Sequence, residues 1–369
     1  MRRPRHGLAL LAALALPSLA SAYDGPVRKR ALRLADFRFE SGETIPELRL
    51  GYETYGQLNA ARDNVVLICH FFMGDGHAAG KYSPSDATPG WWDELIGDGL
   101  AIDTRRYFVV STDLPCGMQV KRDTVITTGP RSLDPRTGVP YGPRFPRTTL
   151  RDYVAAQRAV LDVLGVRRLR LITGPSMGGM LALQWAVTRP DEVDQVLAVS
   201  APIEFSAVDR AGFQASAAAI RSDPLWLLGD YLRFGVEPDY GVAMALHGLL
   251  ALSEGDALWI PWRWQSYLDD ARGVDANHYL QTLGLHTDYT LGAEHGSQAA
   301  GLRRIRADVI LLGSRDDEFI TPEELEDAEQ TLRAARVRAQ RVLFDGTNGH
   351  LSCLEDQGAF APVLSNALR

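Results

Sequence analysis

Apolar positions along the chain alternate between short uninterrupted runs and longer stretches with helical periodicity. The short runs are bounded mostly by turn-forming or polar residues and occur at 65–69, 107–111, 169–173, 196–200, 309–313 and 341–344. Helical spacing of apolar residues covers 152–164 and 177–187, and TPEE at 321–324 is a capping box that predicts a further helix. Strands that alternate with helices are typical of βαβ units and a mostly parallel sheet, buried on both faces.

This alternation stops between about residues 203 and 300, where Trp, Tyr, Leu and Gly dominate and no strand is evident. Because the strand pattern resumes afterwards, we interpret the segment as a helical lid insertion within one domain. Its aromatic residues fit two roles, packing in a core or lining an apolar substrate channel. They are Trp226, Tyr231, Trp259, Trp262, Trp264 and Tyr267.

Residues 1–22 differ from the rest of the chain. Arginines at positions 2, 3 and 5 precede the apolar run GLALLAALAL, and the small residues ASA follow at 20–22. This order is that of a secretory signal peptide cleaved near Ala22. The apolar run is shorter than the roughly 20 residues of a membrane-spanning helix, so we expect no stable membrane insertion. The sequence therefore predicts a leader at 1–22, a folded domain at 23–369, and export to the periplasm or the medium.

Composition and charge narrow the function classes. The 369 residues are 46% hydrophobic and 23% charged, as in ordinary globular proteins. The formal net charge is −7 and would become −10 without the three arginines of the leader, which argues against a nucleic-acid partner. Cys69, Cys116 and Cys353 lack metal-ligand spacing, and the sequence leaves open whether two of them form a disulfide.

The motif that carries chemistry is GPSMG at 174–178, which matches G-x-S-x-G. It directly follows the strand predicted at 169–173 and directly precedes the helix predicted at 177–187. Such a strand–turn–helix exposes the serine hydroxyl above the sheet, and small flanking residues make the sharp turn sterically feasible. We therefore predict that Ser176 is a catalytic nucleophile in an α/β-hydrolase fold, a mostly parallel sheet flanked by helices.

A serine nucleophile needs a general base and an acid that orients the base. In this fold both follow the serine along the chain, first the acid and then a histidine near the C-terminus. His350 is the only histidine after position 295, and it follows the last predicted strand. Asp316 and Asp317 follow the strand at 309–313. We choose Asp317 as the triad acid, although spacing alone leaves Asp316 open.

Two backbone amides are expected to form the oxyanion hole. One is that of Met177, next to the nucleophile, and the other is that of Phe72, in the HFFMGDG turn after the strand at 65–69. The sequence contains no phosphate-loop, dinucleotide-binding or zinc-protease motif, so we predict neither a cofactor nor a metal. The pattern assigns no substrate-binding residue.

Several segments resemble the homoserine O-acetyltransferases of the α/β-hydrolase superfamily. They are LRLGYETYGQLN at 48–59, ICHFFMGDGHAAG at 68–80, GWWDELIGDGLAIDTRRYFVV at 90–110, TGPRSLDPRTGVPYGPRFPRTTLRDYV at 128–154 and GPSMGGMLALQWAVTRPD at 174–191. The resemblance covers most of residues 45–205, weakens through the insertion and returns at 309–353. It implies the same fold, Asp317 as the triad acid, and a homodimer formed through the lid.

The chain departs from the pattern of that family at several positions. The resemblance implies an arginine for the substrate carboxylate where this chain has Leu246, a threonine where it has Met73, a short glycine-rich loop where it has the longer segment 116–128, and an aspartate where it has Leu351. Leucine cannot pair with a carboxylate as arginine does. The departures favour a more apolar substrate than homoserine.

Three functions follow from these observations. The leading hypothesis is an exported serine hydrolase that cleaves an ester, or an amide, of a small and fairly apolar substrate, because an acyl-enzyme outside the cytoplasm would meet water and not acetyl-CoA. The alternative is an O-acyltransferase similar to the homoserine O-acetyltransferases but with a different small acceptor. The third is a binding module that keeps the fold without catalysis.

Overall fold

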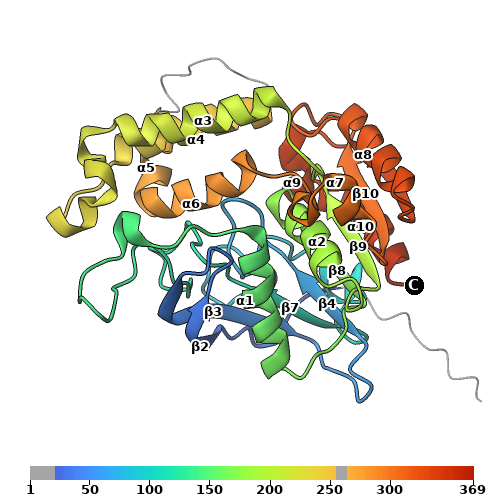
Figure 1. The fold of residues 1–369 in the computed structure, drawn as a ribbon. Coiled ribbons are helices and arrows are strands. Elements are labelled where there is room, and N and C mark those ends of the chain that lie inside the picture. The colour runs from blue at the N-terminus through green and yellow to red at the C-terminus, as the bar shows by residue number, and fades with distance from the viewer. Residues whose placement is uncertain (1–20, 255–263) are drawn as a thin grey trace, which may run out of the picture.

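An eight-stranded sheet runs through the centre of the molecule (Figure 1). The computed structural model describes residues 21–254 and 264–369. The strand order is β11-β10-β9-β8-β4-β7-β3-β2; the pairs β2–β3 and β3–β7 are antiparallel, and the other neighbours are parallel. The strands are β2 (Arg30–Arg38), β3 (Thr44–Tyr55), β4 (Val65–Ile68), β7 (Phe108–Thr112), β8 (Leu171–Pro175), β9 (Gln195–Val199), β10 (Asp308–Ser314) and β11 (Ala339–Phe344).

All six strands predicted from the apolar runs occur within two residues of their expected bounds, and they form the parallel part of the sheet. The predicted α/β-hydrolase fold class is therefore confirmed. The antiparallel pair β2–β3 was not predicted. A second, small sheet consists of β1 (Ser21–Ala22), β5 (Ile96–Asp98) and β6 (Ile102–Asp103).

Both faces of the parallel part of the large sheet are buried, and successive residues of β4 show how. Val65 and Leu67 belong to one apolar cluster, and Val66 and Ile68 belong to the other. This period of two, with apolar residues on both sides, is why the strand reads as an uninterrupted hydrophobic run. The first cluster includes α1 (Leu150–Val163), α2 (Met177–Thr188) and α8 (Pro322–Ala334), and the second includes α9 (Ser352–Glu355) and α10 (Gln357–Ala367).

Two capping boxes fix helix starts on the first face. The Thr149 hydroxyl accepts from the Asp152 amide, and the Asp152 side chain accepts from the Thr149 amide, so α1 begins two residues before the start predicted from periodicity. Thr321 and Glu324 make the same reciprocal pair at α8, as the TPEE sequence predicts.

The segment between β9 and β10 is helical. Its helices are α3 (Ala207–Ser222), α4 (Asp239–Glu254), α5 (Trp264–Gly273), α6 (Ala276–Thr287) and α7 (Gln298–Leu302), with 3₁₀ turns η2 (Pro224–Gly229), η3 (Tyr231–Phe234) and η5 (Ala293–His295). Figure 1 shows α3–α6, hereafter the lid, as a layer above the sheet. The Leu291 amide donates to the Ile203 carbonyl at 2.8 Å, so the two ends of the segment lie side by side.

Candidate active site

Ser176 lies at the sharp turn between β8 and α2. Its φ of 52° and ψ of −119° form a conformation that non-glycine residues rarely adopt and that is typically found as strain at functional sites. A Cβ atom added to Gly174 or to Gly178 would lie 2.1 Å from the carbonyl oxygen of Cys69. Both flanking glycines of the motif are therefore required by the close approach of the turn to the end of β4.

Three side chains predicted to form a triad are hydrogen-bonded in series. His350, in the 3₁₀ turn η6 (Gly349–Leu351) after β11, places Nε2 3.0 Å from Ser176 Oγ and Nδ1 2.9 Å from Asp317 Oδ2. The other oxygen of Asp317 accepts from the amides of Phe319 at 3.0 Å and Ile320 at 2.8 Å. The carboxylate is thus held in place to accept a hydrogen bond from Nδ1–H of His350, which leaves Nε2 as the base toward Ser176.

The neighbouring carboxylate, Asp316, faces another way. Its Oδ1 accepts a hydrogen bond from the Ser314 hydroxyl, and its Oδ2 accepts from the Gly349 amide at 2.9 Å. It therefore ties the end of β10 to the turn that carries His350 and does not contact the imidazole. The sequence could not separate the two aspartates, because adjacent positions differ only in the direction of their side chains.

The turn after β4 carries Phe72, the expected second oxyanion donor. Among the described residues, neither the Phe72 amide nor the Met177 amide donates a hydrogen bond to a protein group. The Met177 amide is at the first position of α2, where a helix has no internal acceptor for it. Both N–H groups are therefore available to a negatively charged oxygen, and Phe72 lines the same cavity as Ser176.

A buried charged network that sequence reasoning missed holds this turn. Lys29 Nζ lies 3.1 Å from Glu53 Oε1 and 3.0 Å from Asp113 Oδ1. Asp113 accepts from the Gly76 amide at 2.8 Å, and Glu53 contacts His77 Nδ1 at 3.1 Å. Burial alone would raise the pKa of Glu53, but the His77 hydrogen bond and the Lys29 charge lower it below its usual value. The only sequence signal is a glutamate inside an otherwise buried strand.

Ser176 and His350 open into a cavity of about 110 Å³ with mostly apolar walls. Phe71, Phe72 and Met73 come from the oxyanion turn, and Leu351, Cys353 and Leu354 come from the turn after β11 and from α9. The remaining lining residues are Phe213, Leu249, Leu283, His286 and Phe319. Among the described residues, no lysine, arginine, aspartate or glutamate lines this cavity.

Three of the departures from the family pattern take different places. Met73 and Leu351 line the cavity. Leu246 on α4 is 1% exposed and packs in the apolar core, outside the set of lining residues. The position at which the resemblance implies an arginine is thus filled by a core leucine.

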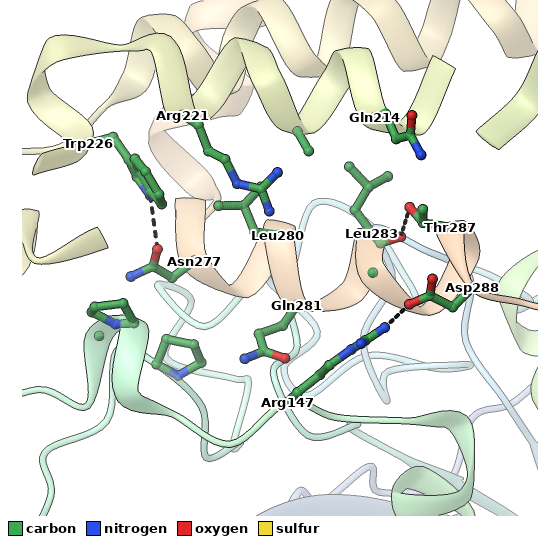
Figure 2. Close-up of a pocket in the computed structure, with 15 residues that line it drawn as sticks. Arg147, Gln214, Arg221, Trp226, Asn277, Leu280, Gln281, Leu283, Thr287 and Asp288 are labelled. Atoms are coloured by element: carbon green, nitrogen blue, oxygen red, sulfur yellow. Dashed lines mark hydrogen bonds and ion pairs between the residues drawn. The ribbon is translucent and has the colours of Figure 1, made fainter. Parts of the chain in front are cut away.

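A larger pocket of about 410 Å³ lies on another face of the lid and contains no triad residue (Figure 2). Arg221 and Gln214 reach into it from α3, and Arg147 forms an ion pair with Asp288 at its floor. Trp226 donates to the Asn277 side chain at 3.1 Å. Leu283 lines both this pocket and the catalytic cavity, so α6 forms a wall between them.

The described tryptophans and tyrosines singled out in the sequence of the insertion do not line the catalytic cavity. Tyr231 and Tyr267 are buried in the core, and Trp226 lines the larger pocket. Trp264 packs against the core and contacts Tyr240, whereas Trp259 and Trp262 lie outside the described residues. The channel interpretation is wrong for the described members of this set, because Phe213 and Phe319 take that place.

The cysteines are all reduced and buried. Burial raises the pKa of Cys69 to about 12, so this thiol stays protonated at neutral pH. Within residues 21–254 and 264–369, no group of three His, Cys, Asp or Glu side chains is arranged to hold a metal ion. In the same ranges no helix has both the length and the apolarity needed to cross a bilayer.

The fold and the site define a serine acyl-transfer enzyme of the α/β-hydrolase fold. The family model described as the alpha/beta hydrolase fold matches residues 64–357. The homoserine O-acetyltransferase of Symbiobacterium thermophilum is 35% identical over 86% of this chain and 88% of its own length. The homoserine O-succinyltransferase of Stutzerimonas stutzeri is 36% identical over 84% of this chain and 86% of its own length.

Solved structures of similar sequence have the same fold over nearly the whole chain. Esterase E22 superposes with a TM-score of 0.87 at 32% identity and covers 93% of this chain and 100% of its own. The homoserine O-acetyltransferase from Bacillus anthracis superposes with a TM-score of 0.88 at 31% identity and covers 94% of this chain and 98% of its own. This chain belongs to the homoserine O-acetyltransferase-like family of α/β-hydrolase-fold enzymes.

Proposed function

We propose that this protein hydrolyses small, fairly apolar esters through an acyl-enzyme on Ser176. Ser176 Oγ attacks the ester carbonyl carbon while His350 Nε2 takes the hydroxyl proton, and the Phe72 and Met177 amides hold the oxyanion. His350 then protonates the leaving alcohol. Water attacks the acyl-enzyme with His350 again as the base, His350 returns the proton to Ser176 Oγ, and the carboxylic acid leaves. Asp317 orients the imidazole and stabilises its charged form.

The observation that carries this proposal is the wall of the cavity that holds Ser176. A free amino acid such as homoserine brings a carboxylate and an ammonium group, and burying either without a partner is costly. No charged side chain lines the described cavity, and Met73 and Leu351 add apolar surface where the resemblance implies polar residues. A structural neighbour at 32% identity, esterase E22, is named as an esterase, and this supports the same activity.

A second candidate is O-acyl transfer to a small acceptor alcohol, and the names of the curated relatives support it better than they support hydrolysis. The two curated relatives reported above, at 35% and 36% identity, are a homoserine O-acetyltransferase and a homoserine O-succinyltransferase. Both reactions share every step up to the acyl-enzyme, and they differ only in whether water or an alcohol attacks it. In that case the acceptor is one without the paired charges of an amino acid.

Product analysis separates the two candidates. We would supply p-nitrophenyl acetate, propionate, butyrate and hexanoate with and without homoserine and uncharged alcohols, and acetyl-CoA with the same acceptors, and measure free acid and acylated acceptor by mass spectrometry. Free acid as the main product with every acceptor supports hydrolysis. If the acylated acceptor exceeded the free acid in aqueous solution, the result would contradict hydrolysis and support O-acyl transfer.

We also propose that the protein is exported and that it forms a homodimer through the lid. Residues 1–20 carry the leader pattern and lie outside the described residues, and cleavage after Ala22 would also remove β1. Exposed apolar side chains on the lid, among them Leu228, Phe234 and Met244, provide surface for a second copy. Mass spectrometry of the mature N-terminus tests export, and light scattering of the purified protein tests the dimer.

A further inference from the structure

The lid contributes a second histidine, His286 of α6, to the catalytic cavity. Its side chain lines the cavity together with Ser176 and His350, and it is 5% exposed. Aromatic rings surround it: the ring centroids of Phe72 and Phe213 lie 5.0 and 5.6 Å from that of the imidazole. The triad does not use this residue, because His350 is the histidine that contacts Ser176.

The hydrogen bonding of His286 determines which nitrogen carries the proton. Nδ1 lies 3.1 Å from the carbonyl oxygen of Thr282. A carbonyl oxygen can only accept, so Nδ1 bears the proton and Nε2 presents a lone pair. Among the described residues, no group donates to Nε2. Burial, together with the nearby charge of His350, lowers the pKa of His286 to about 4, so the imidazole is neutral at pH 7.

An acceptor without a donor in an apolar cavity is unfavourable until a ligand supplies the donor. Among the described lining residues other than Ser176 and His350, His286 alone has a side chain with nitrogen or oxygen atoms, and Nε2 is the nitrogen that has no protein partner. We propose that His286 Nε2 accepts a hydrogen bond from the substrate, so that the enzyme selects esters that carry a hydroxyl or amide N–H group close to the reacting carbonyl. This inference rests on the proposed acyl transfer at Ser176 and names its substrate class.

The test compares matched esters on the native enzyme and on two variants. One pair, p-nitrophenyl butyrate and p-nitrophenyl 3-hydroxybutyrate, places the donor on the acyl group. The other, ethyl butyrate and 2-hydroxyethyl butyrate, places it on the alcohol. His286→Leu removes the acceptor, and His286→Gln keeps one as its side-chain oxygen. His286→Met replaces His286→Leu if a thermal melt shows that the leucine variant does not fold.

We expect the native enzyme to favour the hydroxylated member of one pair by about tenfold in kcat/KM, the effect of one well-placed hydrogen bond at a site built for it. The ratio should fall to near one in the apolar variant and recover in part in His286→Gln. Equal ratios in the native and apolar forms would overturn the inference and make His286 a residue of the cavity wall only. So would a native ratio near one in both pairs.

Labelling of Ser176 by a fluorophosphonate separates this failure from failure of the proposed function. A protein whose Ser176 is labelled, and whose ester ratios do not depend on residue 286, retains the acyl-transfer function and loses the inferred specificity. A protein whose Ser176 is not labelled, and which turns over none of the four esters, contradicts both.

Discussion

The Oδ2 atom of Asp317 lies 2.9 Å from Nδ1 of His350, and the adjacent carboxylate of Asp316 makes no contact with that imidazole. Two neighbouring acids thus have separate tasks. Asp317 orients the histidine, and Asp316 anchors the turn on which the histidine lies.

Asparagine substitutions at these two positions should have unequal effects on catalysis. Asp317→Asn replaces the acceptor at Nδ1 with a group that can impose the wrong tautomer, and we expect kcat to fall by about 10⁴-fold. Asp316→Asn leaves the imidazole contact in place, and we expect kcat to fall by less than about tenfold, with a loss of stability of about 1 kcal/mol. Steady-state kinetics and thermal melts measure both. The reverse order of the two kcat values would show that the acid is Asp316.

Substitutions at Ser176 should separate chemistry from backbone strain. Ser176→Ala and Ser176→Gly both remove the nucleophile, so each should lower kcat by at least about three orders of magnitude and abolish fluorophosphonate labelling. Glycine adopts a φ of 52° with a ψ of −119° without strain, whereas alanine, like the native serine, adopts it only with strain. We therefore expect Ser176→Gly to be more stable than Ser176→Ala by about 1 kcal/mol. Equal melting temperatures would argue that the turn stores no strain.

Loss of the His350 imidazole should reduce activity while leaving the fold intact. In His350→Ala no base among the described residues remains within hydrogen-bond distance of Ser176 Oγ, and we expect kcat to fall by at least about 10³-fold. The circular dichroism spectrum should match that of the native protein. If His350→Ala retained a tenth of the native activity, another group would have to be the base.

Two glycine-to-alanine substitutions form a matched pair for the tight turn. Gly178→Ala would place a Cβ atom 2.1 Å from the Cys69 carbonyl, whereas Gly284→Ala in α6 meets nothing within 4 Å. We expect the first to lower the free energy of unfolding by about 3 kcal/mol through overpacking. The second should raise it by about 0.5–1 kcal/mol, because alanine favours the helix. Urea unfolding of both variants is the measurement, and a stable Gly178→Ala variant would contradict the steric argument.

Stability should fall on acidification between about pH 6.5 and pH 4, partly because of His286. The ordinary pKa of histidine is 6.5, and that of folded His286 is about 4, so in this window the unfolded chain binds a proton that the folded chain does not. The contribution of neutral His286 to the free energy of unfolding is fully present above about pH 6.5 and is lost as the pH falls toward about 4. His286→Leu should make the slope shallower by up to about 1.4 kcal/mol per pH unit. His70 and His278, whose pKa values burial also lowers, keep part of the slope. An unchanged slope in urea titrations would mean that His286 is protonated in the fold.

The sequence by itself determined the parallel sheet, the serine turn and the order of the triad, because these depend on local patterns. Uninterrupted apolar runs mark strands buried on both sides. The G-x-S-x-G motif marks the serine turn because its two glycines pass too close to the Cys69 carbonyl for any side chain to fit. The order of serine, acid and histidine follows from the loops after β8, β10 and β11, which meet at one edge of the sheet.

Only the tertiary structure decided the direction of each side chain and the composition of the cavity. Asp316 and Asp317 are equivalent by spacing and differ by which partner each reaches. The network of Lys29, Glu53 and Asp113 joins residues far apart in the chain, and His286 comes from a helix with no distinctive pattern. The charged network depends on how the strands of the sheet pair, and the place of His286 depends on how the lid packs on the sheet. No local spacing encodes either.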